Sequence, residues 1–176
     1  MITETLFIGA GNMGGAILRS LLTNDSLPSG RITLVDTNHA VLSEFRSNSR
    51  IDTVTSLDQL ESSYRAQAIV LAIKPQYASD VITAARAFMD SRCCVVSIMA
   101  GRAISTLEED FQVPAPIIRC MPNLPIMISD GVTLICPNVH CTIEEIDFAK
   151  QLFSSASQVF EVHNEDFINA GTAISG

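Results

Sequence analysis

Near its start the chain reads Thr5-Leu6-Phe7-Ile8-Gly9-Ala10-Gly11-Asn12-Met13-Gly14, an apolar run that ends in three spaced glycines. In dinucleotide-binding folds, a G-x-G-x-x-G pattern follows the first strand and opens a helix. Its first glycine makes a tight turn, its second lets a pyrophosphate approach the backbone, and its third lets the helix pack closely on the strand. The helix N-terminus offers free N–H donors to the phosphates. We therefore expect nucleotide binding here, and a purely structural glycine turn is the alternative.

Beyond this loop, short β-rich runs alternate with helical patterns, which is the order of an α/β fold. The run near Ala68 is almost wholly apolar, as expected for a central parallel strand covered on both faces. We predict a Rossmann-type, doubly wound, mostly parallel sheet with flanking helices. The expected strands are 5–8, 32–35, 68–73, 94–98, 117–119 and 158–162. The expected helices are 13–21, 40–45, 57–62, 77–89 and 105–111, and one that follows the capping box Thr142-Ile143-Glu144-Glu145.

The division into domains follows from the pattern near the end of the chain. We expect residues 1–160 to form an NAD(P)-binding Rossmann domain. From Glu165 the pattern becomes helical again, and the chain stops at Ile174-Ser175-Gly176 without a polar tail. We therefore interpret residues 161–176 as the truncated beginning of a C-terminal helical domain.

The composition excludes several classes of protein. Hydrophobic residues make up 47% of the 176 residues, and no apolar run reaches the ~18 residues that would span a bilayer. The N-terminus lacks the features of an export signal, so we expect a cytoplasmic protein that does not enter a membrane. A net charge of −8 opposes binding to nucleic acid, because the phosphate backbone attracts basic proteins.

The five cysteines show no C-x-x-C spacing, and we expect them to be buried free thiols. Cys136, His140 and Cys141 lie close together in the sequence and raise the possibility of a metal site. A closed zinc site needs a fourth ligand and a recognised spacing, and neither is present here. We therefore expect no metal.

Candidate ligand-binding residues follow the predicted strands, because parallel sheets bind ligands at the carboxyl ends of their strands. Asp36 ends the second run, 22 residues after Gly14, where a carboxylate can accept hydrogen bonds from the adenosine ribose. Asp36 could instead cap the next helix. Pro75 biases Lys74 toward an extended conformation, and Lys74 should border the cofactor cleft. The same logic applies to Ala100-Gly101 and to residues 121–125.

Together, these segments resemble the pyrroline-5-carboxylate reductase family. The resemblance extends over essentially the whole chain and rests on residues 7–14, Ala72-Ile73-Lys74-Pro75-Gln76, Val95-Val96-Ser97, Ala100-Gly101, Ile118-Arg119-Cys120-Met121-Pro122-Asn123 and Thr172-Ala173-Ile174-Ser175-Gly176. It implies reduction of the cyclic imine pyrroline-5-carboxylate to proline with NADP(H) or NAD(H), as a step of proline biosynthesis. It also implies that the segment starting at residue 161 continues into a helical domain for substrate binding and homo-oligomerisation.

The resemblance also implies which residues bind the ligands. Residues 8–13 would hold the pyrophosphate, and Asp36 and Asn38 would flank the ribose. Gln59 would reach the adenine side, while Lys74 and Ala100 would line the route to the nicotinamide. The full set of expected cofactor-binding residues is Ile8, Gly9, Ala10, Gly11, Asn12, Met13, Gly14, Asp36, Asn38, Gln59, Ala72, Ile73, Lys74, Pro75 and Ala100.

Two residues are expected to bind the substrate, and no catalytic side chain is assigned. Glu165 matches the acidic residue that lies beside the substrate in the family, although it could simply be a charge that complements the helix dipole. Asn123 belongs to the Met-Pro-Asn motif. An imine nitrogen is basic enough to be protonated without a side-chain acid, so the main task of the protein is to position the reactants.

The sequence departs from the family pattern at three places. Leu124 replaces a threonine, Met99 replaces a small residue, and Asp36-Thr37 replaces pairs that receive the phosphate of NADP. Two other functions stay open at this point. One is a different Rossmann oxidoreductase of the β-hydroxyacid or F420-reductase type, and the other is a non-catalytic nucleotide-binding regulator.

Overall fold

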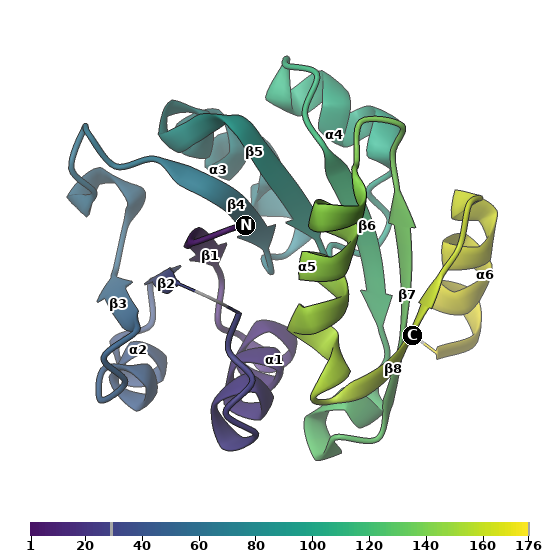
Figure 1. Cartoon of the computed structure of the whole chain (residues 1–176), viewed down its shortest axis with the longest axis horizontal. Helices are drawn as coiled ribbons and strands as arrows, with labels where there is room; N and C mark the ends of the chain where they lie inside the picture. Colours follow the sequence, from purple (N-terminus) through teal and green to yellow (C-terminus); the bar gives the residue numbers. More distant parts are fainter. Residues whose placement is uncertain (29, 176) are drawn as a thin grey trace.

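The computed structural model describes residues 1–28 and 30–175, and Gly176 lies outside the described residues. Eight strands form one sheet in the order β3-β2-β1-β4-β5-β6-β7-β8 (Figure 1). The strands are β1 Glu4–Ile8, β2 Arg31–Val35, β3 Ile51–Val54, β4 Ala66–Leu71, β5 Met89–Ser97, β6 Ile117–Pro122, β7 Gly131–Pro137 and β8 Ser157–Glu161. The helices are α1 Asn12–Thr23, α2 His39–Phe45, α3 Ala78–Ala85, α4 Ile104–Phe111, α5 Ile143–Ser154 and α6 Glu165–Ser175.

Strands β1 to β6 all pair in parallel, which confirms the expected doubly wound sheet. Strand β1 lies between β2 and β4, so the strand order reverses there. In open α/β sheets, ligands bind at such a switch point, outside the carboxyl ends of the strands. The pairing changes at β7, which runs antiparallel to β6, and β8 pairs in parallel with β7.

The sheet is covered on both faces, so the molecule has two cores. Side chains of α1, α2 and α5 pack on one face, and those of α3, α4 and α6 pack on the other. Alternate residues of each central strand supply the two cores: Val70 faces the first core, while Ile69 and Leu71 face the second. This explains why the β4 run is apolar at almost every position.

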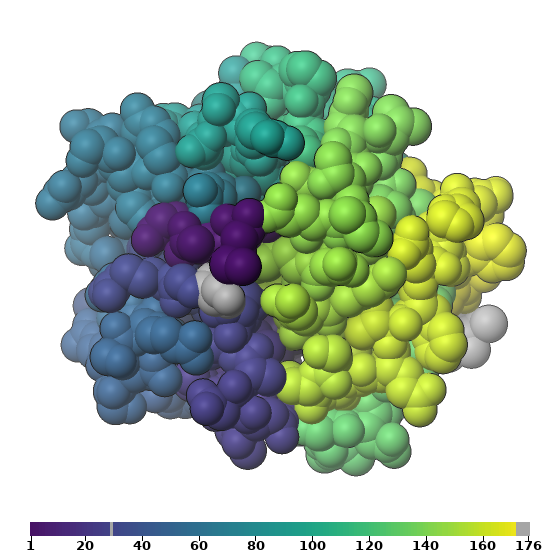
Figure 2. Space-filling model, in the orientation of Figure 1, coloured from purple at the N-terminus to yellow at the C-terminus, as the bar shows by residue number. Residues whose placement is uncertain are grey.

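The C-terminal half of the chain packs against its N-terminal residues. In Figure 2, α5 (green) lies beside the N-terminal residues (purple), and the Met1 amino group forms an ion pair with Glu144 of α5. Helix α6 packs against β6 and β7 and buries Ile168 in the second core. Among residues 1–28 and 30–175, no helix has the length and apolar character that crossing a bilayer requires.

Four features differ from the sequence-based expectations. Strands β3 and β7 were not expected, and β7 is a regular strand with Gly131 at its start. The helix expected over 57–62 is a single 3-10 turn, η1 Leu57–Gln59, because Leu60 returns to an extended conformation. Helix α3 ends at Ala85 rather than near Met89, which instead begins β5.

Candidate dinucleotide site

The loop that follows β1 is built on close contacts that exclude side chains. Gly9 has a φ of +97°, and a Cβ added there would lie 2.5 Å from the carbonyl oxygen of Ala72. A Cβ on Gly14 would lie 2.3 Å from the carbonyl oxygen of Gly9 and 2.9 Å from the Cβ of Ala72. Both glycines are therefore required by the fold itself, since they let β1, β4 and α1 approach one another.

Gly11 is different, because a Cβ on it would meet no protein atom within 4 Å. Gly11 is the N-cap of α1, and neither a side-chain cap nor an acidic residue occupies the first turn of this helix. Among the described residues, no side chain of the cap or first turn of α1 therefore compensates its first N–H groups. Open space at a glycine beside free N–H donors fits the pyrophosphate of a dinucleotide.

Asp36 joins the end of β2 to this loop. Its Oδ2 accepts a hydrogen bond from the backbone N of Ala10 at 2.7 Å, and its Oδ1 accepts one from the backbone N of Asn38 at 2.8 Å. Asn38, and not Asp36, is the N-cap of α2, because the Asn38 side chain accepts from the N of Ala40. The carboxylate of Asp36 therefore lies at the loop, where the ribose next to the pyrophosphate would come.

A cleft of about 600 Å³ opens at this edge of the sheet. Its lining residues end β1 and β2, follow the ends of β1 to β4, or belong to η1, to the 3-10 turn before α3 and to α3 itself, and none of the described ones is a lysine or an arginine. They are Ile8, Gly9, Val35, Asp36, Thr37, Thr55, Ser56, Leu57, Asp58, Ile73, Tyr77, Asp80, Val81 and Ala84. The position beside Asp36 and η1 makes this cleft a candidate for the adenosine half of a dinucleotide.

A larger hollow, of about 780 Å³, lies at the opposite edge of the sheet. It surrounds the start of β5 and the segment before β6, and Asp90 and Pro116 line it. We assign the site to the smaller cleft because the phosphate loop and the carboxyl ends of the parallel strands meet there.

The expected cofactor residues on the later strands lie around the same edge. Ala72 continues the sheet, since its N donates to the carbonyl oxygen of Ile8 at 2.8 Å. Lys74 is extended, with φ −71° and ψ 142°, as its position before Pro75 predicts, and its side chain is exposed. The side chain of Gln59 folds back toward Thr55, and its Oε1 accepts a hydrogen bond from the backbone N of Thr55 at 2.8 Å. The cleft is lined instead by the preceding residues 55–58.

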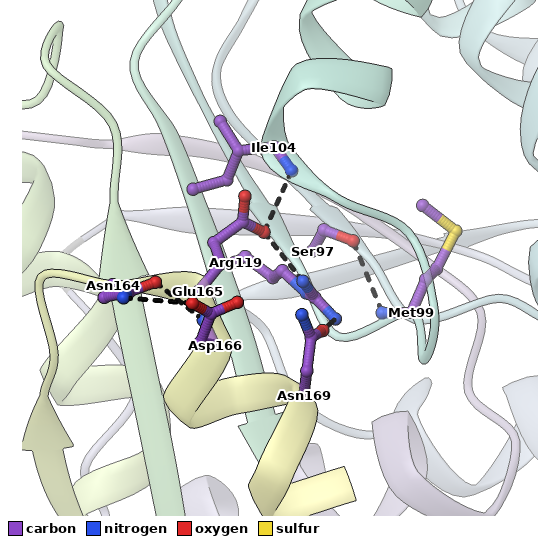
Figure 3. Close-up of polar contacts among 8 residues, drawn as sticks. All are labelled: Ser97, Met99, Ile104, Arg119, Asn164, Glu165, Asp166 and Asn169. Atoms are coloured by element: carbon purple, nitrogen blue, oxygen red, sulfur yellow. Dashed lines mark hydrogen bonds and ion pairs between the residues drawn. The ribbon is translucent and has the colours of Figure 1, made fainter.

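The loop between β5 and α4 carries Ala100, which is exposed, and Gly101, which has a φ of +69°. The loop is fixed at its start by Ser97, whose hydroxyl oxygen accepts from the N of Met99 at 3.3 Å (Figure 3). Because β5 lies beyond β4 from the phosphate loop, this loop is where the nicotinamide half would extend.

The two expected substrate residues have different surroundings. Asn123 follows β6, and its Oδ1 accepts from the N of Val132 at 2.9 Å, so its side chain fixes the connection to β7. Glu165, at the start of α6, pairs with Arg119 of β6 at 2.7 Å (Figure 3). The sequence reasoning did not single out Arg119 as a site residue. A charged residue inside the apolar run Ile117-Ile118-Arg119-Cys120 was the signal that could have found it.

The cysteines do not provide a nucleophile. Burial raises the pKa of the Cys93 thiol to about 12 and that of the Cys141 thiol to about 11, and it also raises the pKa of Cys94, Cys120 and Cys136. A thiol is nucleophilic only when it is deprotonated, so these residues are inert at neutral pH. In the part of the chain that the structure describes, no three His, Cys, Asp or Glu side chains are grouped to hold a metal ion.

Comparison with known proteins finds similarity to a family of oxidoreductases and to several reductases. A family model described as NADP oxidoreductase coenzyme F420-dependent matches residues 5–101. Pyrroline-5-carboxylate reductase of Pseudomonas aeruginosa is 31% identical over 170 residues, which cover 97% of this chain and 61% of that protein. Human pyrroline-5-carboxylate reductase 2 is 30% identical over 175 residues, which cover 97% of this chain and 53% of that protein.

Solved structures agree with the observed fold. A pyrroline-5-carboxylate reductase from Coxiella burnetii has a TM-score of 0.87 and 25% identity, covering 100% of this chain and 64% of that one. A Plasmodium falciparum pyrroline carboxylate reductase with NADP bound has a TM-score of 0.79 and 24% identity, covering 99% and 62%. The chain thus spans between 53% and 64% of the length of these four proteins.

Proposed function

Because the chain belongs to the family described as NADP oxidoreductase coenzyme F420-dependent, we propose that it is the dinucleotide-binding part of a pyrroline-5-carboxylate reductase. The predicted resemblance to pyrroline-5-carboxylate reductases is confirmed. The proposed reaction is NAD(P)H-dependent reduction of pyrroline-5-carboxylate to proline. The observation that carries the proposal is the open position at Gly11, at the N-terminus of α1 and beside the Asp36 cleft.

When bound, the nicotinamide cofactor would supply the hydride that reduces the C=N bond of the imine. The residues of this chain would bind the cofactor and orient it. The N–H groups at the start of α1 would hold the pyrophosphate, and the carboxylate of Asp36 would accept hydrogen bonds from the ribose hydroxyls. Orientation of two reactants at contact distance contributes up to about 7–11 kcal/mol, so binding geometry alone can carry much of the rate enhancement.

The remaining assignments belong to the same proposal. Residues 1–160 form the cofactor domain, and residues 161–176 begin a second domain that completes the substrate site and joins subunits. Glu165 and Asn123 lie on the substrate side, and Lys74 and Ala100 lie on the route to the nicotinamide. The partner is a small cyclic imine, the whole protein is a homo-oligomer, and a cytoplasmic location stays a prediction.

The experiment that tests the function uses the full-length gene product. NADPH and NADH oxidation is followed with pyrroline-5-carboxylate, and proline is quantified as the product. We expect one proline for each cofactor oxidised, and no turnover with a β-hydroxyacid or with the deazaflavin F420. Turnover of either alternative substrate without imine reduction would overturn the proposal in favour of another Rossmann oxidoreductase, and tight cofactor binding without any turnover would indicate a regulator.

A further inference from the structure

A buried arginine lies beside the end of the strand that leads into the loop of Ala100 and Gly101. Arg119 is 2% exposed and sits on β6, where it pairs in register with Ser97, the last residue of β5. Its side chain is on the face of the sheet that α4 and α6 cover, since Ile117 two residues earlier packs in that core. A guanidinium removed from water in this way is costly unless charged or polar groups compensate it.

The compensating groups come from α6. Nη1 of Arg119 donates to Oε1 of Glu165 at 2.7 Å, and Nη2 donates to Oδ1 of Asn169 at 3.0 Å (Figure 3). Glu165 and Asn169 are four residues apart, so they lie one above the other on a single face of the helix. Within the described residues, Nε of Arg119 has no hydrogen-bond partner. The guanidinium therefore depends on α6 for its satisfied hydrogen bonds.

Glu165 then connects this helix to the loop that follows β5. Its Oε1, the atom that Arg119 contacts, also accepts from the backbone N of Ile104 at 3.0 Å. Ile104 is the first residue of α4, and the N-cap Ala103 offers no side-chain acceptor. A carboxylate from α6 thus caps α4 from outside the helix, where a negative charge also complements the helix dipole. The loop 98–103 is held between this cap and Ser97.

We infer that Arg119 is a positioning residue for the nicotinamide half of the cofactor: it holds Glu165 against the start of α4 and so fixes the shape of the loop that carries Ala100 and Gly101. This inference rests on one part of the proposed function, namely that a dinucleotide occupies the site with its nicotinamide toward this loop. The pyrophosphate and the adenosine would bind at Gly11 and Asp36, and among the described residues neither of these two forms a hydrogen bond or an ion pair with Arg119, Glu165 or Asn169. Loss of Arg119 therefore affects one end of the ligand.

The test compares two ligands that differ in the nicotinamide ring. Calorimetry measures the dissociation constants of NADH and of ADP-ribose for the wild type, Arg119→Met and Arg119→Lys, with circular dichroism to confirm folding. We expect Arg119→Met to bind ADP-ribose like the wild type and NADH at least about fivefold more weakly, the lower end of typical coupling between sites. Arg119→Lys, which keeps the charge, restores part of the NADH affinity.

Two further variants keep the inference open to refutation. Asn169→Ala removes one partner of the guanidinium, so it weakens NADH binding selectively even if Arg119→Met fails to fold. Asp166→Asn is the matched control, because it neutralises the neighbouring carboxylate of α6, which contacts Asn164 rather than Arg119, and it leaves both affinities unchanged. Three results would each overturn the inference. Folded variants could lose affinity for both ligands equally, or keep the wild-type affinity for NADH. The wild type could also bind NADH no more tightly than ADP-ribose. Absence of binding of either ligand to the wild type refutes the proposed function instead.

Discussion

At the level of single residues, the glycines of the phosphate loop have separable roles. Gly9 and Gly14 sit where a Cβ would collide with backbone atoms, whereas the space around Gly11 holds no protein atom. The sequence pattern predicts all three roles from spacing alone, because each glycine of the motif has a fixed place relative to the strand and the helix. Of the three, Gly11 is the one with open space beside it, where a ligand would fit.

The first prediction concerns Gly11→Val. The variant should fold like the wild type but lose dinucleotide binding, because the branched side chain fills the space for the pyrophosphate. Calorimetry with NADH and thermal unfolding measure the two properties separately. In contrast, Gly14→Ala should lower the free energy of unfolding by about 1–3 kcal/mol, as overpacking of a tight contact does. A folded Gly11→Val that keeps wild-type affinity contradicts the assignment of this loop.

A second prediction at this scale concerns cofactor choice. Asp36, Asp58 and Asp80 line the cleft, and no lysine or arginine is among its described lining residues. Like charges about 4–5 Å apart repel by roughly 1–4 kcal/mol at dielectrics between water and a protein surface, so a 2′-phosphate is disfavoured. We expect NADH to bind at least as tightly as NADPH, and Asp36→Ser to shift the ratio toward NADPH by about tenfold, which corresponds to ~1.4 kcal/mol.

The control for this comparison is Asp90→Ser, at the opposite edge of the sheet, which should leave the ratio of the two dissociation constants unchanged. Tighter NADPH binding by the wild type, without improvement in Asp36→Ser, would show that Asp36 does not face the ribose.

At the level of elements, α5 illustrates how a local motif sets both structure and pH response. The capping box expected at Thr142 is present, and Oε2 of Glu145 accepts from the N of Thr142 at 2.7 Å. Burial acts to raise the pKa of Glu145, but the hydrogen bonds from Thr142 and from the Glu145 backbone, together with the charge of Arg92, outweigh it, so the pKa is lowered from its ordinary value of 4.5. A carboxyl group whose pKa is lower in the folded state stabilises the fold above its unfolded pKa.

The prediction is that Glu145→Gln destabilises the protein at pH 7 by about 0.3–1 kcal/mol, the usual size of a charge near a helix N-terminus, since Gln keeps an acceptor oxygen for the cap. The difference from the wild type should shrink as the pH falls below about 4.5, because the wild type then loses the ionised cap. Urea unfolding of both proteins at pH 7 and at pH 3 measures this difference in the free energy of unfolding. Asp147→Asn, an exposed residue of the same helix, is the matched control, and an equal pH response in both variants would exclude the cap as the cause.

Some elements and contacts could be predicted from the sequence, and others could not. The phosphate loop, the central strands and the capping box follow from local patterns, and all were found. Strand β7 was missed because Val132 is exposed while Thr133 is buried, so the strand lacks the alternation of apolar inward and polar outward residues that marks a half-buried strand. The pairing of Arg119 with Glu165 joins residues 46 positions apart, and no local pattern encodes such a contact.

At the scale of the whole molecule, the chain matches its relatives along almost all of its own length but covers only part of theirs. We expect the 176-residue chain to bind NADH or NADPH and to reduce pyrroline-5-carboxylate at a small fraction of the rate of a full-length protein. The physical reason is that holding two reactants together needs surfaces on both sides of them. Steady-state rates of the two proteins at equal concentration make the comparison, and matching rates would refute the expectation.

We propose that a dinucleotide binds along the carboxyl ends of the strands, at the loop from Gly9 to Gly14. A titration of the isotopically labelled chain with NADH, followed by the amide resonances in NMR, tests this binding. We expect the largest shifts at residues 10–14 and 36–38, with smaller ones at residues 98–104. Shifts confined to the hollow around Asp90 and Pro116, or no shifts at millimolar NADH, would contradict it.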